Sequence, residues 1–192
     1  MDTRSLWDTP VWLVPPAVEF QNELKTMKKR IIKYKHLADE TLNKSVNNGW
    51  RVDDPHKLEG LTLLRDYIVW MSRKVFKEVN YDDENGKKNL RMTSWLNVHN
   101  EYGYNTIHNH ADSLLSGVIY INTPEGSGDL IFRDPRPIAA SNKLIKNANS
   151  TFKVSPKAGL SVLFPGYLEH WVAPSRTREN DPRISIAFNV HE

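Results

Sequence analysis

The chain has 192 residues, 39% of them hydrophobic, which fits one domain with a single core that needs no disulfide. Its 26 basic and 23 acidic residues leave a net charge of +3, too small to indicate a nucleic acid as a partner. There is no cysteine, which excludes thiolate metal ligands, iron–sulfur clusters and cysteine nucleophiles. Histidine and carboxylate side chains must therefore supply any metal site.

No membrane segment is expected. The N-terminus lacks a basic segment followed by an apolar one, and no apolar run approaches the roughly 20 residues that span a bilayer. We therefore expect a soluble, cytoplasmic protein; its oligomeric state cannot be predicted from the sequence.

Two amphipathic helices are expected in the N-terminal part. Residues 10–16 are a short apolar segment bracketed by proline, which suits an edge strand or an extended arm. From residue 17 the apolar residues recur with a period near 3.6, which predicts a helix that ends near Asn48 and Gly49. A second helical pattern extends from about residue 56 to 79.

Strand patterns replace the helical period after the turn signal at Asn85 and Gly86. Eight short runs rich in β-branched and aromatic residues follow, separated by glycine, proline and asparagine: 91–98, 104–110, 114–122, 129–132, 151–154, 160–164, 170–173 and 184–190. They predict a mainly β fold, a jelly roll with the two helices packed on the outside of one sheet.

One domain is expected over residues 1–192, with 1–90 as helical support and 91–192 as the β core. Residues 114–121 are apolar at odd and even positions, as expected if one face meets the helices and the other lines the barrel. The polar stretch 141–150 is expected to be a surface loop.

Candidate metal ligands occur in two distant runs. His110 and Asp112 lie in H-N-H-A-D, and His170 follows sixty positions later in F-P-G-Y-L-E-H-W. Residues two apart share a face of a strand, so His110 and Asp112 can both point inward, and an adjacent strand can bring His170 to them. Two imidazoles and one carboxylate form the facial triad that binds non-haem Fe(II) and leaves coordination positions open.

Two other interpretations of these residues remain. His108 and His110 also share a face, which would suit a cupin-like metal site with His170, although the glutamate usual in cupins is missing after them. We retain His110, Asp112 and His170, and expect His108 to pack or to support the ligands. Alternatively, no metal binds, and these side chains only make ordinary hydrogen bonds and packing contacts.

Arg183 and Ser185, in R-I-S, share one face of the last predicted strand. A guanidinium and a hydroxyl together can bind a carboxylate, such as the far end of 2-oxoglutarate. The alternative is a surface ion pair, for example with Asp181, which would contribute little.

At these residues the chain resembles the Fe(II)- and 2-oxoglutarate-dependent oxygenases, specifically the prolyl-4-hydroxylase-like group and a related set of uncharacterised oxygenases. The resemblance covers residues 91–192 and is carried by these features: Tyr102 eight residues before His110, H-A-D at 110–112, L-S-G-V-I-Y at 115–120, F-P-G before His170, and R-I-S at 183–185.

The resemblance implies a double-stranded β-helix, with iron bound by His110, Asp112 and His170. It also implies 2-oxoglutarate chelating the iron, with its far carboxylate on Arg183. Tyr102 lies just upstream of the histidines, where its hydroxyl could touch the co-substrate. Prolyl hydroxylases typically have lysine where Arg183 stands, so the resemblance does not extend to a prolyl substrate.

The function expected from these features is a dioxygenase that uses Fe(II), O2 and 2-oxoglutarate, releases succinate and CO2, and hydroxylates a small-molecule or peptide substrate. Two rivals stay open: a cupin-like dioxygenase that needs no 2-oxoglutarate, and a jelly-roll binding module without catalysis.

Overall fold

The computed structural model describes residues 8–16, 18–38, 45–81, 90–136, 150–178 and 180–192. Its N-terminal half contains two α-helices, two short 3-10 helices and two strands: β1 (Trp12–Val14), α1 (Val18–Lys33), η1 (Tyr34–Leu37), β2 (Val46–Asp53), η2 (Pro55–Lys57) and α2 (Leu63–Glu78). The remaining strands are β3 (Arg91–His108), β4 (Leu115–Asn122), β5 (Leu130–Arg133), β6 (Thr151–Val154), β7 (Ser161–Pro165), β8 (His170–Val172) and β9 (Arg183–His191).

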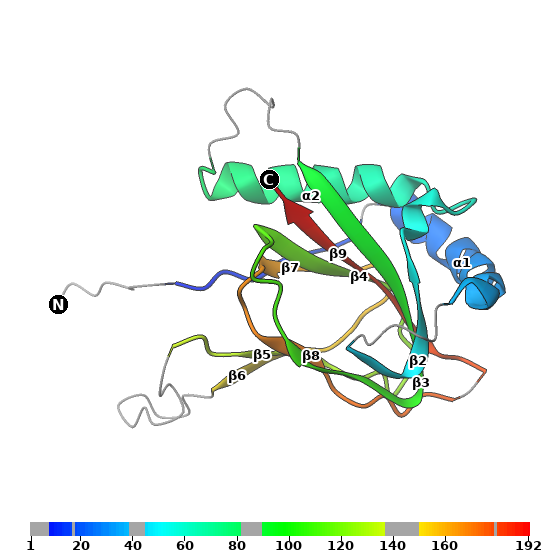
Figure 1. Ribbon diagram of the computed structural model, residues 1–192. Helices are drawn as coiled ribbons and strands as arrows, with labels where there is room; N and C mark the ends of the chain where they lie inside the picture. The colour runs from blue at the N-terminus through cyan, green and yellow to red at the C-terminus, as the bar shows by residue number, and fades with distance from the viewer. Residues whose placement is uncertain (1–7, 17, 39–44, 82–89, 137–149, 179) are drawn as a thin grey trace.

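All the strands belong to one antiparallel sheet, in the order β1-β7-β4-β9-β3-β8-β5-β6, with β2 also paired to β3. The sheet curls so that β5, β6 and β8 face the larger part, and α1 and α2 cover the opposite side of that part (Figure 1). The mainly β fold with helices outside one sheet, predicted from the sequence, is confirmed.

Two apolar clusters hold these layers together. One lies between the helices and the sheet, where α2 contributes Leu64, Ile68 and Met71. The other lies inside the curl and includes Val118 and Phe164. Neighbouring residues of β4 thus belong to different clusters, which explains why this strand is apolar on both faces.

The N-terminal part departs from the predicted pattern in one respect. The first helix ends at Lys33, and the region predicted as its end is strand β2. A Cβ at Gly49 would lie 2.3 Å from the Val98 carbonyl oxygen, so this glycine lets β2 approach β3 at a register shift. Asn48 and Gly49, expected near the end of the first helix, instead lie in a bulged strand.

The predicted strand 91–98 and most of the predicted strand 104–110 are parts of the single long strand β3, which ends at His108. Its first half pairs with β9 and its end pairs with β8, so β3 joins the two sides of the curl. The segment 10–16 does contain an edge strand, β1, which pairs with β7. Of the predicted loop 141–150, all but Ser150 lies outside the described residues.

Among the described residues, no helix has both the length and the apolar character required to cross a membrane.

Candidate metal and co-substrate site

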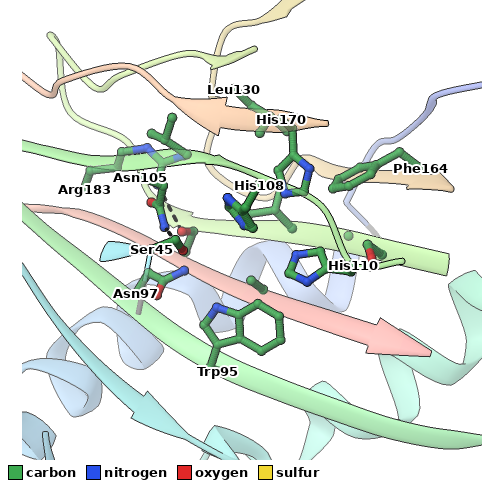
Figure 2. Close-up of a pocket in the computed structure, with 16 residues that line it drawn as sticks. Ser45, Trp95, Asn97, Asn105, His108, His110, Leu130, Phe164, His170 and Arg183 are labelled. Carbon is green, nitrogen blue, oxygen red and sulfur yellow. Dashed lines mark hydrogen bonds between the residues drawn. The ribbon is translucent and has the colours of Figure 1, made fainter. Parts of the chain in front are cut away.

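Three histidines converge inside the curl, at the end of β3 and the start of β8. His108 is the last residue of β3 and is paired directly with His170, the first residue of β8, while His110 follows in the connection to β4. The possible ligand atoms of these three side chains all lie within 4.8 Å of one another. Figure 2 shows the three rings pointing toward a common space.

A close approach between two turns fixes the position of His110. Its backbone N–H donates to the Gly166 carbonyl oxygen at 2.8 Å, and its own carbonyl accepts from the Ser113 N–H at 2.8 Å. A Cβ at Gly166 would lie 2.2 Å from the Ser113 carbonyl oxygen. The glycine of the F-P-G run is therefore required for the two turns to meet.

Backbone carbonyls fix the tautomer of two of the histidines. The Nδ1 atom of His108 lies 2.7 Å from the Thr106 carbonyl oxygen, and Nδ1 of His170 lies 2.8 Å from that of Leu168. A carbonyl oxygen can only accept, so both Nδ1 atoms carry the proton and both Nε2 atoms keep a free lone pair. This arrangement is typical of metal-binding histidines.

Burial keeps the three rings neutral. Burial, with a smaller contribution from the neighbouring His108, lowers the pKa of His170 to about 3 and that of His110 to about 4. Burial lowers the pKa of His108 as well. Neutral imidazole is the form that binds a metal ion, so the group is ready to act as a ligand at neutral pH without first losing protons.

The structure does not bring Asp112 into this group of histidines. Hydrogen bonding of β3 stops at His108, so the alternation of a strand does not extend to residue 112, which lies in a turn. The Asp112 side chain is 81% exposed, and its carboxylate lies 3.9 Å from Nδ1 of His191. Among the described residues, the group that could hold a metal consists of His108, His110 and His170.

Arg183 is fully buried and lies on the same face of β9 as Ser185. Its Nε donates to the Gly128 carbonyl oxygen at 3.3 Å, and its Nη1 donates to Ser185 Oγ at 3.0 Å. Its Nη2 is buried and has no hydrogen-bond partner. Burial lowers the pKa of Arg183, but a guanidinium stays charged in proteins. The site therefore holds a positive charge with a free donor.

One pocket connects the histidines with this arginine. Its lining includes both ends of the site, His108, His110 and His170 at one end and Arg183 and Ser185 at the other. Figure 2 shows Asn105 close to Arg183, and Asn97 near Ser45. Trp95 and Asn97 also line this pocket.

A second, more open cleft of about 500 Å³ adjoins the pocket. Ser45, Trp95 and His110 line both spaces, so the cleft reaches the histidines from outside. Its other lining residues are polar or charged: Arg51, Asp53, Asp54, Arg91, Thr93, Ser94, Asp112, Asn189 and His191.

Tyr102 lies away from the site. It sits in the bend of β3 with a φ of 62°, and its side chain is 59% exposed. It lines a separate cleft with Trp50 and Pro182. The bend turns the phenol outward, so we leave Tyr102 out of the proposed site.

His99 is a buried residue near the site that the sequence analysis did not single out. Its Nδ1 lies 3.3 Å from Arg183 Nη1, and its Nε2 lies 2.7 Å from Asn105 Oδ1. Burial, with the nearby Arg183, lowers the pKa of His99 to about 3. The even spacing of Trp95, Asn97 and His99 is the signal that would have placed it on the inner face.

The depressed pKa of His99 predicts an acid-sensitive fold. Its ordinary pKa is 6.5 and its folded value about 3, so below pH 6.5 the unfolded chain binds a proton that the folded one does not. Lowering the pH from 7 to 5 should therefore reduce the free energy of unfolding of the metal-free protein by about 2 kcal/mol through this residue. In urea unfolding, the free energy of unfolding of His99→Gln should fall by about 2 kcal/mol less than that of the wild type over the same pH interval. Equal losses in both proteins would contradict the assignment.

Comparison with known proteins identifies the family. The family model described as "Putative 2OG-Fe(II) oxygenase" matches residues 93–189, just over half of the chain. The chain belongs to this family. It is therefore an oxidoreductase of the Fe(II)- and 2-oxoglutarate-dependent oxygenases, with O2 as the oxidant. No curated protein sequence matches the chain.

Solved structures confirm the fold of this oxygenase. A prolyl-4-hydroxylase from Pseudomonas putida is 13% identical, with a TM-score of 0.66 over 96% of this chain and 93% of that one. The 2-oxoglutarate-dependent epimerase SnoN from nogalamycin biosynthesis is 12% identical, with a TM-score of 0.68 over 96% and 77%. HygX from Streptomyces hygroscopicus, which holds nickel and 2-oxoglutarate, is 12% identical, with a TM-score of 0.56 over 95% and 83%. These proteins share the double-stranded β-helix.

Proposed function

We propose that the protein is a dioxygenase in which His108, His110 and His170 hold Fe(II), while Arg183 and Ser185 hold the far carboxylate of 2-oxoglutarate. The observation that carries this proposal is a pocket with three convergent neutral imidazoles at one end and a buried guanidinium with a free N–H at the other. The donor set suits both groups, since imidazole binds Fe(II) and arginine recognises carboxylates.

The choice of His108 over Asp112 as the third ligand rests on the two side chains' surroundings. His108 is held by Thr106 with Nε2 free, whereas the Asp112 carboxylate is largely exposed toward the outer cleft. The set His110, Asp112 and His170, expected from the sequence, remains the alternative, and the variants described in the Discussion separate the two.

When bound together, the iron and 2-oxoglutarate supply the oxidation: O2 and 2-oxoglutarate give succinate, CO2 and one oxygen atom for insertion into a substrate C–H bond. The protein's own part is to orient the co-substrate and to exclude water. Arg183 and Ser185 hold one end of the co-substrate. Trp95 beside His110 and Phe164 beside His170, with ring centroids 5.6 and 4.6 Å away, limit the access of water to the ligands.

The primary substrate would approach through the outer cleft. The residues of the paired strands β3 and β9 that face the inside form a row, with Ser185 at its deep end. This row continues outward into the cleft through two pairs of opposite residues, first Thr93 and Asn189 and then Arg91 and His191. Ser116 donates to Asn189 Oδ1, so the amide nitrogen of Asn189 remains a donor toward the cleft. A small polar molecule suits this lining better than an apolar one.

An anaerobic titration with Fe(II) and 2-oxoglutarate tests the proposal. We expect a visible charge-transfer band that needs both components, and, after O2 is admitted, succinate in an amount that depends on 2-oxoglutarate. Oxygen consumption without the keto acid would support the cupin-like alternative. Absence of the band and of succinate in a metal-loaded protein would contradict the proposed function.

A further inference from the structure

A chain of hydrogen bonds extends from Arg183 to the mouth of the pocket. Asn105 Nδ2 donates to Ser45 Oγ at 2.8 Å, which leaves Asn105 Oδ1 to face His99 Nε2 at 2.7 Å. An amide oxygen only accepts, so His99 carries its proton on Nε2. Its Nδ1 is then an acceptor for Arg183 Nη1 at 3.3 Å. This chain of contacts determines the orientation and tautomer of a ring that is 0% exposed.

The acceptors around Arg183 are all neutral: the Gly128 carbonyl, Ser185 Oγ and His99 Nδ1. Among the described residues, no carboxylate lies within 4.0 Å of the guanidinium; Asp129 acts on it from farther away. The Tyr120 ring centroid lies 5.2 Å from the guanidinium carbon, and the buried Tyr120 hydroxyl, which also interacts with Arg183, is neutral because burial raises its pKa.

A buried cation is costly when no anion is near, so such arginines usually pair with a carboxylate of the protein. A carboxylate at position 99 would make that pair and would satisfy the arginine before any ligand arrived. A neutral histidine orients the same nitrogen and leaves the charge uncompensated. The energy of pairing is then available to an incoming anion.

We propose that His99 is a positioning residue for the co-substrate: as the neutral Nε2–H tautomer held by Asn105, it orients Arg183 and leaves its charge free for a carboxylate. This inference rests on the proposed function, because it assumes that Arg183 binds 2-oxoglutarate. It adds that residue 99 acts through Arg183, and touches neither the metal ion nor the co-substrate.

Two substitutions separate positioning from mere packing. His99→Leu fills the space but removes both hydrogen bonds, so it should raise the dissociation constant for 2-oxoglutarate by about 10- to 100-fold. His99→Gln keeps an acceptor for Arg183 and a donor for Asn105, and should stay within about 3-fold of the wild type. Both variants should bind Mn(II) as the wild type does, because residue 99 lies outside the metal group.

A third variant tests the role of charge. His99→Asp would place a carboxylate beside Arg183 and should weaken the binding of 2-oxoglutarate at least as much as His99→Leu does. If His99→Leu does not fold, Asn105→Ala serves instead. It removes the hydrogen bond that holds the His99 ring without changing a contact of Arg183, and should produce a smaller increase in the dissociation constant for 2-oxoglutarate. The dissociation constants are measured by isothermal titration of the Mn(II)-loaded proteins, with circular dichroism as the check on folding.

Unchanged affinity in His99→Leu, or in Asn105→Ala if it must serve instead, would overturn the inference. The inference would also be overturned if a folded His99→Gln bound 2-oxoglutarate as weakly as His99→Leu, or if His99→Asp bound it as tightly as the wild type. The proposed function is judged separately by the wild-type protein. If that protein forms succinate but the His99 variants bind normally, only the role of His99 fails. If it binds 2-oxoglutarate with the expected variant pattern but forms no succinate, the catalytic proposal fails and the role of His99 stands.

Discussion

Arg183→Ala should lower the affinity for 2-oxoglutarate by about 100- to 1000-fold, which corresponds to about 3–4 kcal/mol. The expected size is large because the guanidinium is fully buried and its Nη2 has no partner. A carboxylate bound there would make a charge-assisted hydrogen bond shielded from water. The affinity is measured by isothermal titration of 2-oxoglutarate into the Mn(II)-loaded protein.

The matched control is Arg73→Ala, which removes an exposed arginine from α2, on the outside of the molecule. This variant should bind 2-oxoglutarate as the wild type does. The affinity for Mn(II) alone should be unchanged in both variants, because Arg183 is not among the candidate ligands. A dissociation constant for Arg183→Ala within about 3-fold of the wild-type value would remove this residue from the co-substrate site.

His108→Ala should lower the affinity for Fe(II) by about 100-fold or more, whereas Asp112→Ala should change it by less than about 10-fold. The difference follows from geometry. The His108 imidazole belongs to the group whose ligand atoms lie within 4.8 Å of one another, and the Asp112 side chain is 81% exposed. His170→Ala serves as the positive control, since both candidate ligand sets include His170.

Binding is measured anaerobically with Fe(II), or with Co(II), whose visible absorption reports the ligand set. The reverse result, in which Asp112→Ala loses the metal and His108→Ala keeps it, would establish the histidine–aspartate set. Intact binding in all three variants would mean that the metal lies elsewhere.

The sequence predicted the parts of the fold that depend on local periodicity. The stripe that includes Met27 and Ile31, and that of Ile68 and Met71, identified the two helices, and their buried faces match. The alternation along β9 likewise placed Arg183 and Ser185 on one face, where they do form a hydrogen bond. These patterns are visible because a single element determines each of them.

The parts that were missed depend on where an element ends or on what it pairs with. Strand β2 contains Asn48 and Gly49, which locally favour a turn, and only its pairing with β3 makes it a strand. The exposure of Asp112 follows from the end of β3 at His108, and strand ends are poorly predicted from sequence. The spacing of His99 from Trp95 and Asn97 could have placed it on the inner face, but its role depends on contacts with Asn105, farther along β3, and with Arg183 on β9.

The proposed metal and co-substrate site is tested most directly by a crystal structure of the protein with Mn(II) and 2-oxoglutarate bound under anaerobic conditions. We expect one metal ion bound to Nε2 of His108 and His170 and to the His110 ring. We also expect the keto-acid end of 2-oxoglutarate to lie on the metal and its far carboxylate on Arg183. A metal ion bound through Asp112 without His108, or a co-substrate that does not reach Arg183, would contradict the proposed site.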